Sequence, residues 1–216
     1  MFRVNTTYAS TAWGGRGNKY IQASSMVSAP RCVRDNGAKL KLYLAGPDVF
    51  LINALGVGHQ KRTMCQARGF EGFYPLDNKL PEDEAAIFAA NQGLMDKADA
   101  GLFNLSPFRG PSADAGTIFE LGYMVAQGKK VFGYSNDGAS YAARAVRSHG
   151  PTVEEDGVFL DRNGHMIERF GLTDNLMITE AVRSSGGFCV AKAEVGEPKL
   201  AAYSAFDACL AKIQGE

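Results

Sequence analysis

A strand, a loop and a helix followed by a second strand occupy residues 100–134, and this order constrains the fold more than any other feature. Residues 100–105 (AGLFNL) are mostly apolar, which is typical of a buried strand. After a loop rich in proline, glycine and serine, the helical pattern of 115–127 ends at Gly128, and the apolar run 131–134 follows. A helix between two short strands indicates a right-handed parallel unit.

The same alternation extends over most of the chain. Further strands are expected at 40–44, 70–74 and 188–191, and further helices at 54–68, from Pro81 onward and at 200–213. We therefore predict an α/β fold, with a doubly wound, parallel five-stranded sheet and a long insertion after the fourth strand.

The insertion after residue 134 runs for about forty residues, too long for an ordinary connection between a strand and a helix. Within it, 140–147 has a helical pattern. The segments 158–160 and 165–169 flank an Asn-Gly pair, which favours a tight hairpin turn between them. Such an insertion over the strand ends is more often a lid or a subunit contact than part of the core.

Composition excludes several classes of partner. The chain has 216 residues, 45% of them hydrophobic and 21% charged, with 23 basic and 23 acidic side chains. That length suits one α/β domain, and nothing in the charge pattern indicates a nucleic-acid partner. No apolar run approaches the length of a membrane span. The four cysteines form no CxxC pair and are expected to be reduced thiols, which favours a cytoplasmic protein.

The first 34 residues differ from the rest, because they hold five basic side chains and no acidic one. We expect residues 1–37 to be a poorly ordered or peripheral extension and residues 38–216 to be the folded domain. A targeting segment is the alternative, since transit peptides have a similar composition.

Two acids stand where the central loop meets its helix. In a parallel sheet, ligands bind at the carboxyl ends of the strands, where this loop should lie. Glu120 lies within about two turns of the helix start, where the helix dipole favours an ionised carboxylate suited to nucleophilic or electrostatic work. Gly116 leaves space above Glu120, and Asp114 can cap the helix or face a ligand. The alternative is that Asp114 only caps and that Glu120 is a surface acid.

Asp48 lies in the loop after the first strand. It could face a substrate, but we expect it to cap the following helix, because aspartate is favoured at that position.

Several segments, in this order along the chain, resemble the nucleoside 2-deoxyribosyltransferases, flavodoxin-like enzymes that exchange the base of a 2'-deoxynucleoside. The Ser106–Gly110 and Phe170–Leu172 segments resemble a protozoan-type branch of that family. The segments that carry the family resemblance are Leu42-Tyr-Leu-Ala-Gly-Pro47, Tyr74-Pro-Leu-Asp-Asn78, Asp114-Ala-Gly-Thr-Ile-Phe-Glu-Leu-Gly122 and Asn175-Leu-Met177.

The resemblance implies a role for each site residue. Glu120 would be the nucleophile, held by the Tyr43 hydroxyl, and Asp114 would contact the base. Asn175 would be donated to the sugar in a neighbouring subunit, which implies a homo-oligomer, a dimer or a hexamer, with shared active sites. The substrates would be a 2'-deoxynucleoside and a free nucleobase, with no metal or organic cofactor. Further residues expected to bind substrate are Asn91, Gly46, Phe50, Asp77 and Gly116.

Two positions depart from the family pattern. Asn91 stands where many members have an aspartate, and an amide cannot transfer a proton as a carboxyl does. Lys79 stands where some members have a glutamine that contacts the base. We therefore expect base recognition to differ in this chain.

Two other functions remain open. One is an N-glycosidase that uses water as the acceptor and cleaves 2'-deoxynucleosides or their 5'-monophosphates. The acid Asp48 in the first loop counts against a phosphate there. The other is a non-catalytic nucleotide-binding module, which would not need Tyr43, Asp114, Glu120 and Asn175 together.

Overall fold

The computed structural model describes residues 37–77, 83–150, 153–155, 158–192 and 200–215. Five parallel strands form one sheet in the spatial order β2-β1-β3-β4-β7. This confirms the predicted α/β fold with a parallel five-stranded sheet, and the order is that of flavodoxin-like proteins. The strands are β1 (Lys41–Ala45), β2 (Glu71–Phe73), β3 (Ala100–Asn104), β4 (Lys130–Ser135) and β7 (Cys189–Ala191).

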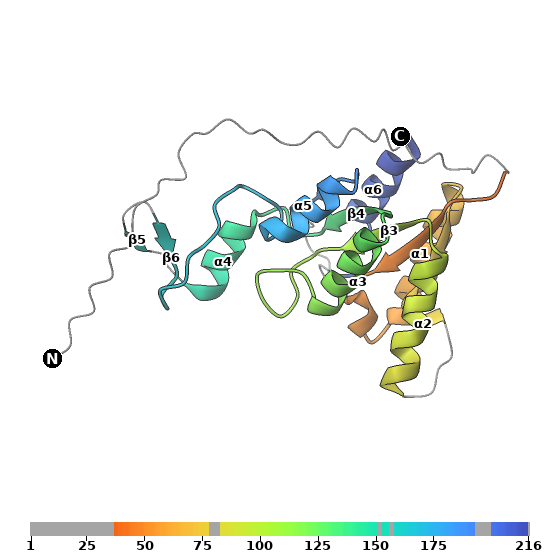
Figure 1. Ribbon diagram of the computed structural model, residues 1–216, viewed down its shortest axis with the longest axis horizontal. Helices are drawn as coiled ribbons and strands as arrows, with labels where there is room; N and C mark the ends of the chain where they lie inside the picture. The colour runs from red at the N-terminus through yellow and green to blue at the C-terminus, as the bar shows by residue number, and fades with distance from the viewer. Residues whose placement is uncertain (1–36, 78–82, 151–152, 156–157, 193–199, 216) are drawn as a thin grey trace.

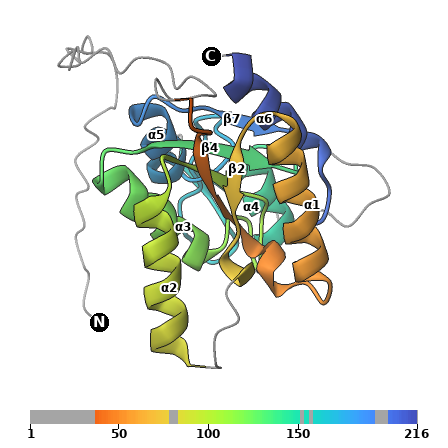
Figure 2. The ribbon, with the colours of Figure 1, turned by 90° about the vertical axis from the view of Figure 1, so that its right-hand side faces the viewer.

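Helices cover both faces of the sheet (Figures 1 and 2), so the fold is doubly wound as predicted. On one face lie α1 (Ala54–Ala67) and α6 (Ser204–Gly215). On the other lie α2 (Glu84–Lys97), α3 (Ala115–Ala126) and α5 (Leu176–Ser184). Each face has its own apolar core, which is why the central strands are apolar along their whole length.

Alternation along β1 decides which side chain faces the candidate site. Leu42 and Leu44 pack into the core under α1 and α6, whereas Tyr43 and Ala45 belong to the core under α2, α3 and α5. Successive side chains of a strand point to opposite faces, so Tyr43 is directed toward α3. The strand thereby delivers its tyrosine to the helix that carries Glu120.

The long insertion after β4 is present as predicted and extends away from the sheet (Figure 1). It contains α4 (Tyr141–His149), β5 (Val153–Glu155) and β6 (Val158–Leu160). The predicted hairpin turn between 158–160 and 165–169 is confirmed: Leu160 forms an antiparallel bridge with Met166, and the N–H groups of Asp161 and Ile167 donate to the carbonyls of His165 and Phe159, each at 2.8 Å. β6 also pairs with β5, a pairing that the sequence did not predict. The Asp161 carboxylate accepts the backbone N–H groups of residues 163 and 165 and so stabilises the turn.

Two predictions fall on residues outside the described ranges. The extension is one, so the domain boundary near residue 38 stays a prediction. The helix start at Pro81 is the other. The described part of α2 begins at Glu84, after Asp83, whose side chain accepts the N–H of Ala85. None of the described helices is long and apolar enough to cross a membrane.

Candidate active site

A cavity of about 320 Å³ opens where β1, β2 and β3 end, at the edge of the sheet where a ligand was expected. Three segments that follow these strands supply part of its wall, and helices α2 and α3 supply the rest. Its volume falls within the range of small-molecule sites. The lining residues are Gly46, Val49, Phe50, Pro75, Leu76, Ile87, Asn91, Asp114, Gly116, Thr117 and Glu120.

Glu120 and Tyr43 form the closest polar contact at this cavity. The Tyr43 hydroxyl donates a hydrogen bond of 2.5 Å to Glu120 Oε1. Tyr43 is completely buried, while Glu120 is partly buried and lines the cavity. Burial raises the pKa of Tyr43 far above its ordinary value, and the charge of Glu120 adds to the effect. The hydroxyl is therefore a permanent donor that fixes one oxygen of the carboxylate.

The prediction that the helix dipole keeps the Glu120 carboxyl ionised was wrong. Burial raises the pKa of Glu120 to about 7, against the lowering effect of the Tyr43 hydrogen bond and with a further rise from the charge of Asp114. Because α3 begins at Ala115, Glu120 lies in the second turn, and the helix dipole acts mainly on the first. Desolvation is the dominant influence, so the carboxyl titrates near neutral pH rather than being held ionised.

Asp114 both caps helix α3 and lines the cavity. It is the N-cap of α3, and its Oδ2 accepts the backbone N–H of Thr117 at 2.9 Å and the Thr117 hydroxyl at 3.1 Å. It also lines the cavity together with Glu120. Among the described residues, no hydrogen bond to Asp114 uses its other oxygen, so capping leaves that oxygen available to a ligand.

The loop after β1 contains a buried charge, the carboxylate of Asp48. The prediction that Asp48 caps α1 is wrong, because the N-cap of α1 is Asn53. Asp48 Oδ2 accepts from Lys61 Nζ at 2.7 Å and from the Tyr74 hydroxyl at 3.0 Å, and its Oδ1 accepts from Asn104 Nδ2 at 3.0 Å. Burial raises the pKa of Asp48, but the Lys61 ammonium and the hydrogen bonds outweigh it, and the pKa lies below the usual range. The Asp48 charge is thus neutralised inside the protein.

Gly46 is required by the same loop. A Cβ atom at this position would lie 2.4 Å from the Cβ of Asn104 and 2.6 Å from Asp48 Oδ1. Any larger residue would push apart β3 and the short helix η1 (Pro47–Phe50), which places Val49 and Phe50 in the cavity wall. The glycine therefore shapes the wall through a close approach.

Three other predicted residues also line the cavity. Gly116 lies close to Asp114, since a Cβ atom there would be 3.2 Å from Asp114 Oδ2. Phe50 stacks on Phe108, with ring centroids 5.2 Å apart and planes 8° from parallel. Asn91 presents a buried Oδ1 that has no hydrogen-bond partner among the described residues. A buried amide oxygen without a partner, on the wall of a cavity, is suited to accept a hydrogen bond from a ligand.

Two predicted residues lie outside this cavity lining. Asp77 ends the short helix η2 (Pro75–Asp77), forms an ion pair with Arg62 and accepts the N–H of Tyr74 at 3.1 Å. Asn175 caps α5 by accepting the N–H of Met177, and its Nδ2 donates to Glu168 Oε1 at 2.7 Å. Within one chain, neither side chain is part of the cavity wall.

Several residues of the site were not predicted from the sequence. Ile87 lies four residues before Asn91, so both fall on one face of α2, and Thr117 lies three before Glu120 on α3. Lys61 was missed as well, although it continues the buried stripe of Val57. Among the described residues, no group of three or more His, Cys, Asp or Glu side chains could hold a metal ion.

Comparison with known proteins agrees with this geometry. The family model of the nucleoside 2-deoxyribosyltransferases matches residues 42–177, and the chain belongs to this family. An uncharacterized protein of Schizosaccharomyces pombe is 35% identical over 167 residues, which cover 68% of this chain and 79% of the relative. The family that the sequence motifs indicated is therefore confirmed.

The fold is also similar to that of a solved structure, a 2-desoxiribosyltransferase from Leishmania mexicana. The two have a TM-score of 0.58 and 26% sequence identity, and the match covers 82% of this chain and 98% of the other.

Proposed function

We propose that the protein transfers the 2-deoxyribosyl group between purine or pyrimidine bases of 2'-deoxynucleosides. The observation that carries the proposal is the hydrogen bond from the buried Tyr43 hydroxyl to Glu120 Oε1, since the Glu120 carboxyl lines the cavity together with Asp114. A carboxyl with a pKa of about 7 is about half ionised at neutral pH, which provides a nucleophile without a counter-ion to quench it. Membership of the family supports the same substrates.

The reaction would be a double displacement. The Glu120 carboxylate attacks C1' of the deoxyribose through an oxocarbenium-like transition state, and the bond from C1' to the base nitrogen breaks. The departing base takes a proton from Asp114 or from a water that Asp114 orders. A nitrogen of a second base then attacks C1' of the glycosyl-Glu120 ester from the opposite face, its proton passes to Asp114 or to the ordered water, and the C1'–Glu120 bond breaks to release the carboxylate. Two inversions give overall retention.

The proposal includes an oligomer in which Asn175 serves the sugar of a neighbouring site. Exposed apolar side chains around Asn175 support a subunit contact on this part of the insertion: Met166 and Met177 are each 71% exposed, and Phe170 is 62% exposed. Exposed apolar patches of this kind are typical of protein interfaces. The Glu168 carboxylate holds the Asn175 amide and so orients it before any partner arrives.

A second function, hydrolysis of a 2'-deoxynucleoside 5'-monophosphate with water as the acceptor, gains support from one observation. The Asp48 charge, which the sequence analysis set against a phosphate, is buried and paired with Lys61 and does not line the cavity. The electrostatic objection to a phosphate in this loop therefore disappears.

One assay separates the two functions. Deoxyinosine and adenine are incubated with the protein, and deoxyadenosine and free deoxyribose are both quantified. We expect deoxyadenosine to form faster than free sugar, and the excess to increase with adenine concentration. Free sugar that dominates at saturating adenine would favour the hydrolase, and a parallel reaction with the 5'-monophosphate would show which substrate it prefers. Formation of neither product would leave the non-catalytic nucleotide-binding module.

A further inference from the structure

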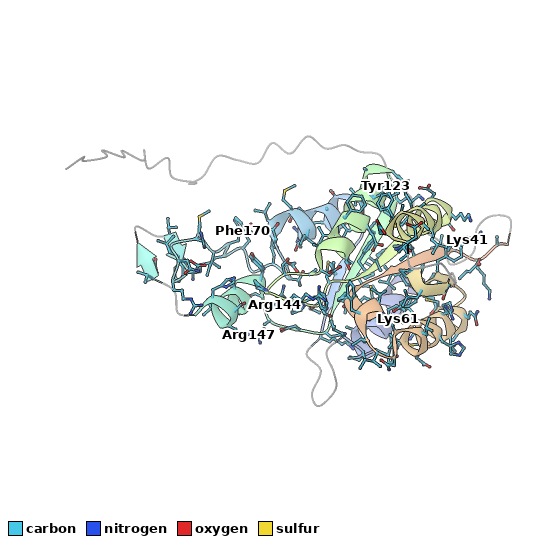
Figure 3. The ribbon with its side chains drawn as sticks, turned by 90° about the horizontal axis from the view of Figure 1, so that it is seen from below. Lys41, Lys61, Tyr123, Arg144, Arg147 and Phe170 are labelled. Carbon is cyan, nitrogen blue, oxygen red and sulfur yellow. The ribbon has the colours of Figure 1, made fainter. Side chains whose placement is uncertain are left out.

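Asp174 and Arg144 form a buried ion pair. Figure 3 shows Arg144 where the insertion meets the body of the protein. Their side chains are 1% and 2% exposed, and Arg144 Nη2 lies 3.2 Å from Asp174 Oδ2. Arg144 belongs to α4, and Asp174 directly precedes Asn175, the N-cap of α5. A buried ion pair adds little net stability by itself, since the desolvation of both charges offsets their attraction. Its remaining contacts therefore matter more than the pair alone.

The pair holds the three residues that lead into Asp114. Arg144 Nε donates to the carbonyl of Pro111 at 2.7 Å. The Asp174 carboxylate accepts from the Ser112 hydroxyl at 2.5 Å and from the backbone N–H of the next residue at 3.0 Å. Asp114 follows immediately. The backbone before this acid is thus fixed by the insertion, whereas the tip of the same loop is exposed.

The same carboxylate also holds the start of α5. Asp174 Oδ1 accepts the backbone N–H of Asn175 at 2.7 Å, and the Asp174 carbonyl accepts from the Thr179 hydroxyl at 3.2 Å. One buried side chain therefore connects the backbone beside Asp114 to the backbone of Asn175. Asp114 and Asn175 lie about sixty positions apart in the sequence, yet the Asp174 carboxylate holds the backbone at both places.

We propose that Asp174, held by Arg144, is a positioning residue that sets the Asp114 carboxyl for proton delivery to the leaving base. The inference rests on the proposed transferase function. Proton transfer from a placed acid contributes typically about 10²- to 10⁴-fold to a rate. A displacement of about 1 Å can remove about 10²-fold. Loss of the anchor should therefore slow only those reactions in which the base needs a proton.

The test compares the release of two leaving groups in a single turnover, measured before any acceptor base is added. Hypoxanthine departs from deoxyinosine with a proton, whereas 7-methylguanine departs as a neutral base from the cationic nucleoside 2'-deoxy-7-methylguanosine and needs none. We expect Asp174→Asn to lower the rate constant of base release about 10²-fold with deoxyinosine and less than about threefold with 2'-deoxy-7-methylguanosine. Asp114→Asn should show the same selectivity. Equal losses with both substrates, or no loss with either, would overturn the inference.

A milder variant guards against misfolding, because Asp174→Asn leaves the buried Arg144 charge poorly compensated. Ser112→Ala removes one hydrogen bond to Asp174 and leaves the ion pair intact. It should lower the rate constant of base release about 3- to 10-fold with deoxyinosine only, as expected for the loss of a bond worth about 1 kcal/mol. Ser184→Ala, which removes a comparable hydroxyl bond at the far end of α5, is the matched control and should change neither rate.

Exchange of deoxyinosine with adenine by the wild-type protein separates this inference from the proposed function. If the wild type catalyses this exchange but the variants show no selective loss with deoxyinosine, Asp174 has no positioning role. Absence of wild-type exchange would overturn the proposed function and the inference with it.

Discussion

Asp48, which is buried, and Glu120, which is partly buried, are both carboxyl groups near the carboxyl ends of the strands, but they lie in opposite electrostatic surroundings. Asp48 has the ammonium of Lys61 at 2.7 Å and two neutral donors, and its pKa is lowered. Glu120 has one neutral donor, the Tyr43 hydroxyl, and burial raises its pKa to about 7. Burial alone therefore does not mark a reactive carboxylate. The absence of a positive partner among the described residues around Glu120 leaves its charge available to a positive centre such as C1' of an oxocarbenium ion.

Replacement of Glu120 by glutamine should have the largest effect. An amide of the same shape cannot act as the nucleophile, so exchange of deoxyinosine with adenine should fall on the order of 10⁴-fold or more, as when other enzymes lose their nucleophile. The measurement is kcat under saturating substrate. A variant that keeps more than about one tenth of the wild-type rate would contradict the mechanism, because a loss of less than tenfold corresponds to under about 1.4 kcal/mol.

The same variant should be more stable than the wild type at high pH. The pKa of Glu120 is raised from 4.5 to about 7 in the folded protein, which therefore keeps a proton that the unfolded chain has released between these values. Wild-type stability thus falls as pH rises from about 4.5 to about 7 and stays lower above it, by up to about 3 kcal/mol. Urea unfolding at pH 5 and pH 8 should show the advantage of Glu120→Gln growing with pH. A constant difference would mean that Glu120 is not desolvated.

Lys61→Met should lower the free energy of unfolding. The substitution leaves Asp48 buried without its cation, and breaking one side of a buried pair costs about 3–5 kcal/mol. The double variant Lys61→Met with Asp48→Asn should recover most of this loss, because no charge then remains buried. Urea unfolding of wild type, single and double variants measures the coupling. A double variant as unstable as the single one would show that Lys61 contributes packing rather than charge.

The sequence allowed the sheet, and the position of Glu120 near the strand ends, to be predicted, because both depend on local patterns. Apolar runs separated by helices define parallel strands, and the alternation along β1 directs Tyr43 to the side of Glu120. The buried partners could not be predicted in the same way. Lys61 meets Asp48 across 13 residues, and Tyr74 meets it across 26. Lys61 follows Val57 on the buried side of α1, but no local pattern indicates which side chain it meets.

The titration of Glu120 was missed for a related reason. The helix position of a carboxyl can be read from the sequence, but its desolvation depends on how completely other elements cover it. Here coverage outweighs the helix dipole, which the local pattern overstated. The insertion shows the same limit, since its sequence indicated the turn at 161–164 but not the pairing of β5 with β6.

Tyr43→Phe should have an effect of intermediate size, a shift in the pKa of Glu120, and so tests how Glu120 differs from Asp48. The Tyr43 hydrogen bond lowers the pKa of Glu120, so its removal should raise that pKa further above about 7. A hydrogen bond to a charged group contributes about 1.5–3 kcal/mol, which corresponds to about 1–2 pKa units. In the wild type, kcat/KM should rise with pH through about 7 as Glu120 ionises, and in Tyr43→Phe the inflection should lie higher. An unchanged inflection would mean that another group controls the profile.

Gly116→Ala should have the smallest effect and tests whether free space beside the two acids matters. The new methyl group would lie 3.2 Å from Asp114 Oδ2 and would narrow the cavity, so we expect KM for deoxyinosine to rise about 3- to 10-fold, a cost of about 1 kcal/mol. Gly122→Ala is the matched control on the same helix, because a Cβ atom there would meet nothing within 4 Å. It should leave KM unchanged and stabilise the protein by about 0.5–1 kcal/mol, since alanine favours a helix over glycine. A similar change in KM in both variants would indicate an effect on α3 as a whole, and the glycine beside Asp114 would then have no special part in admitting the substrate.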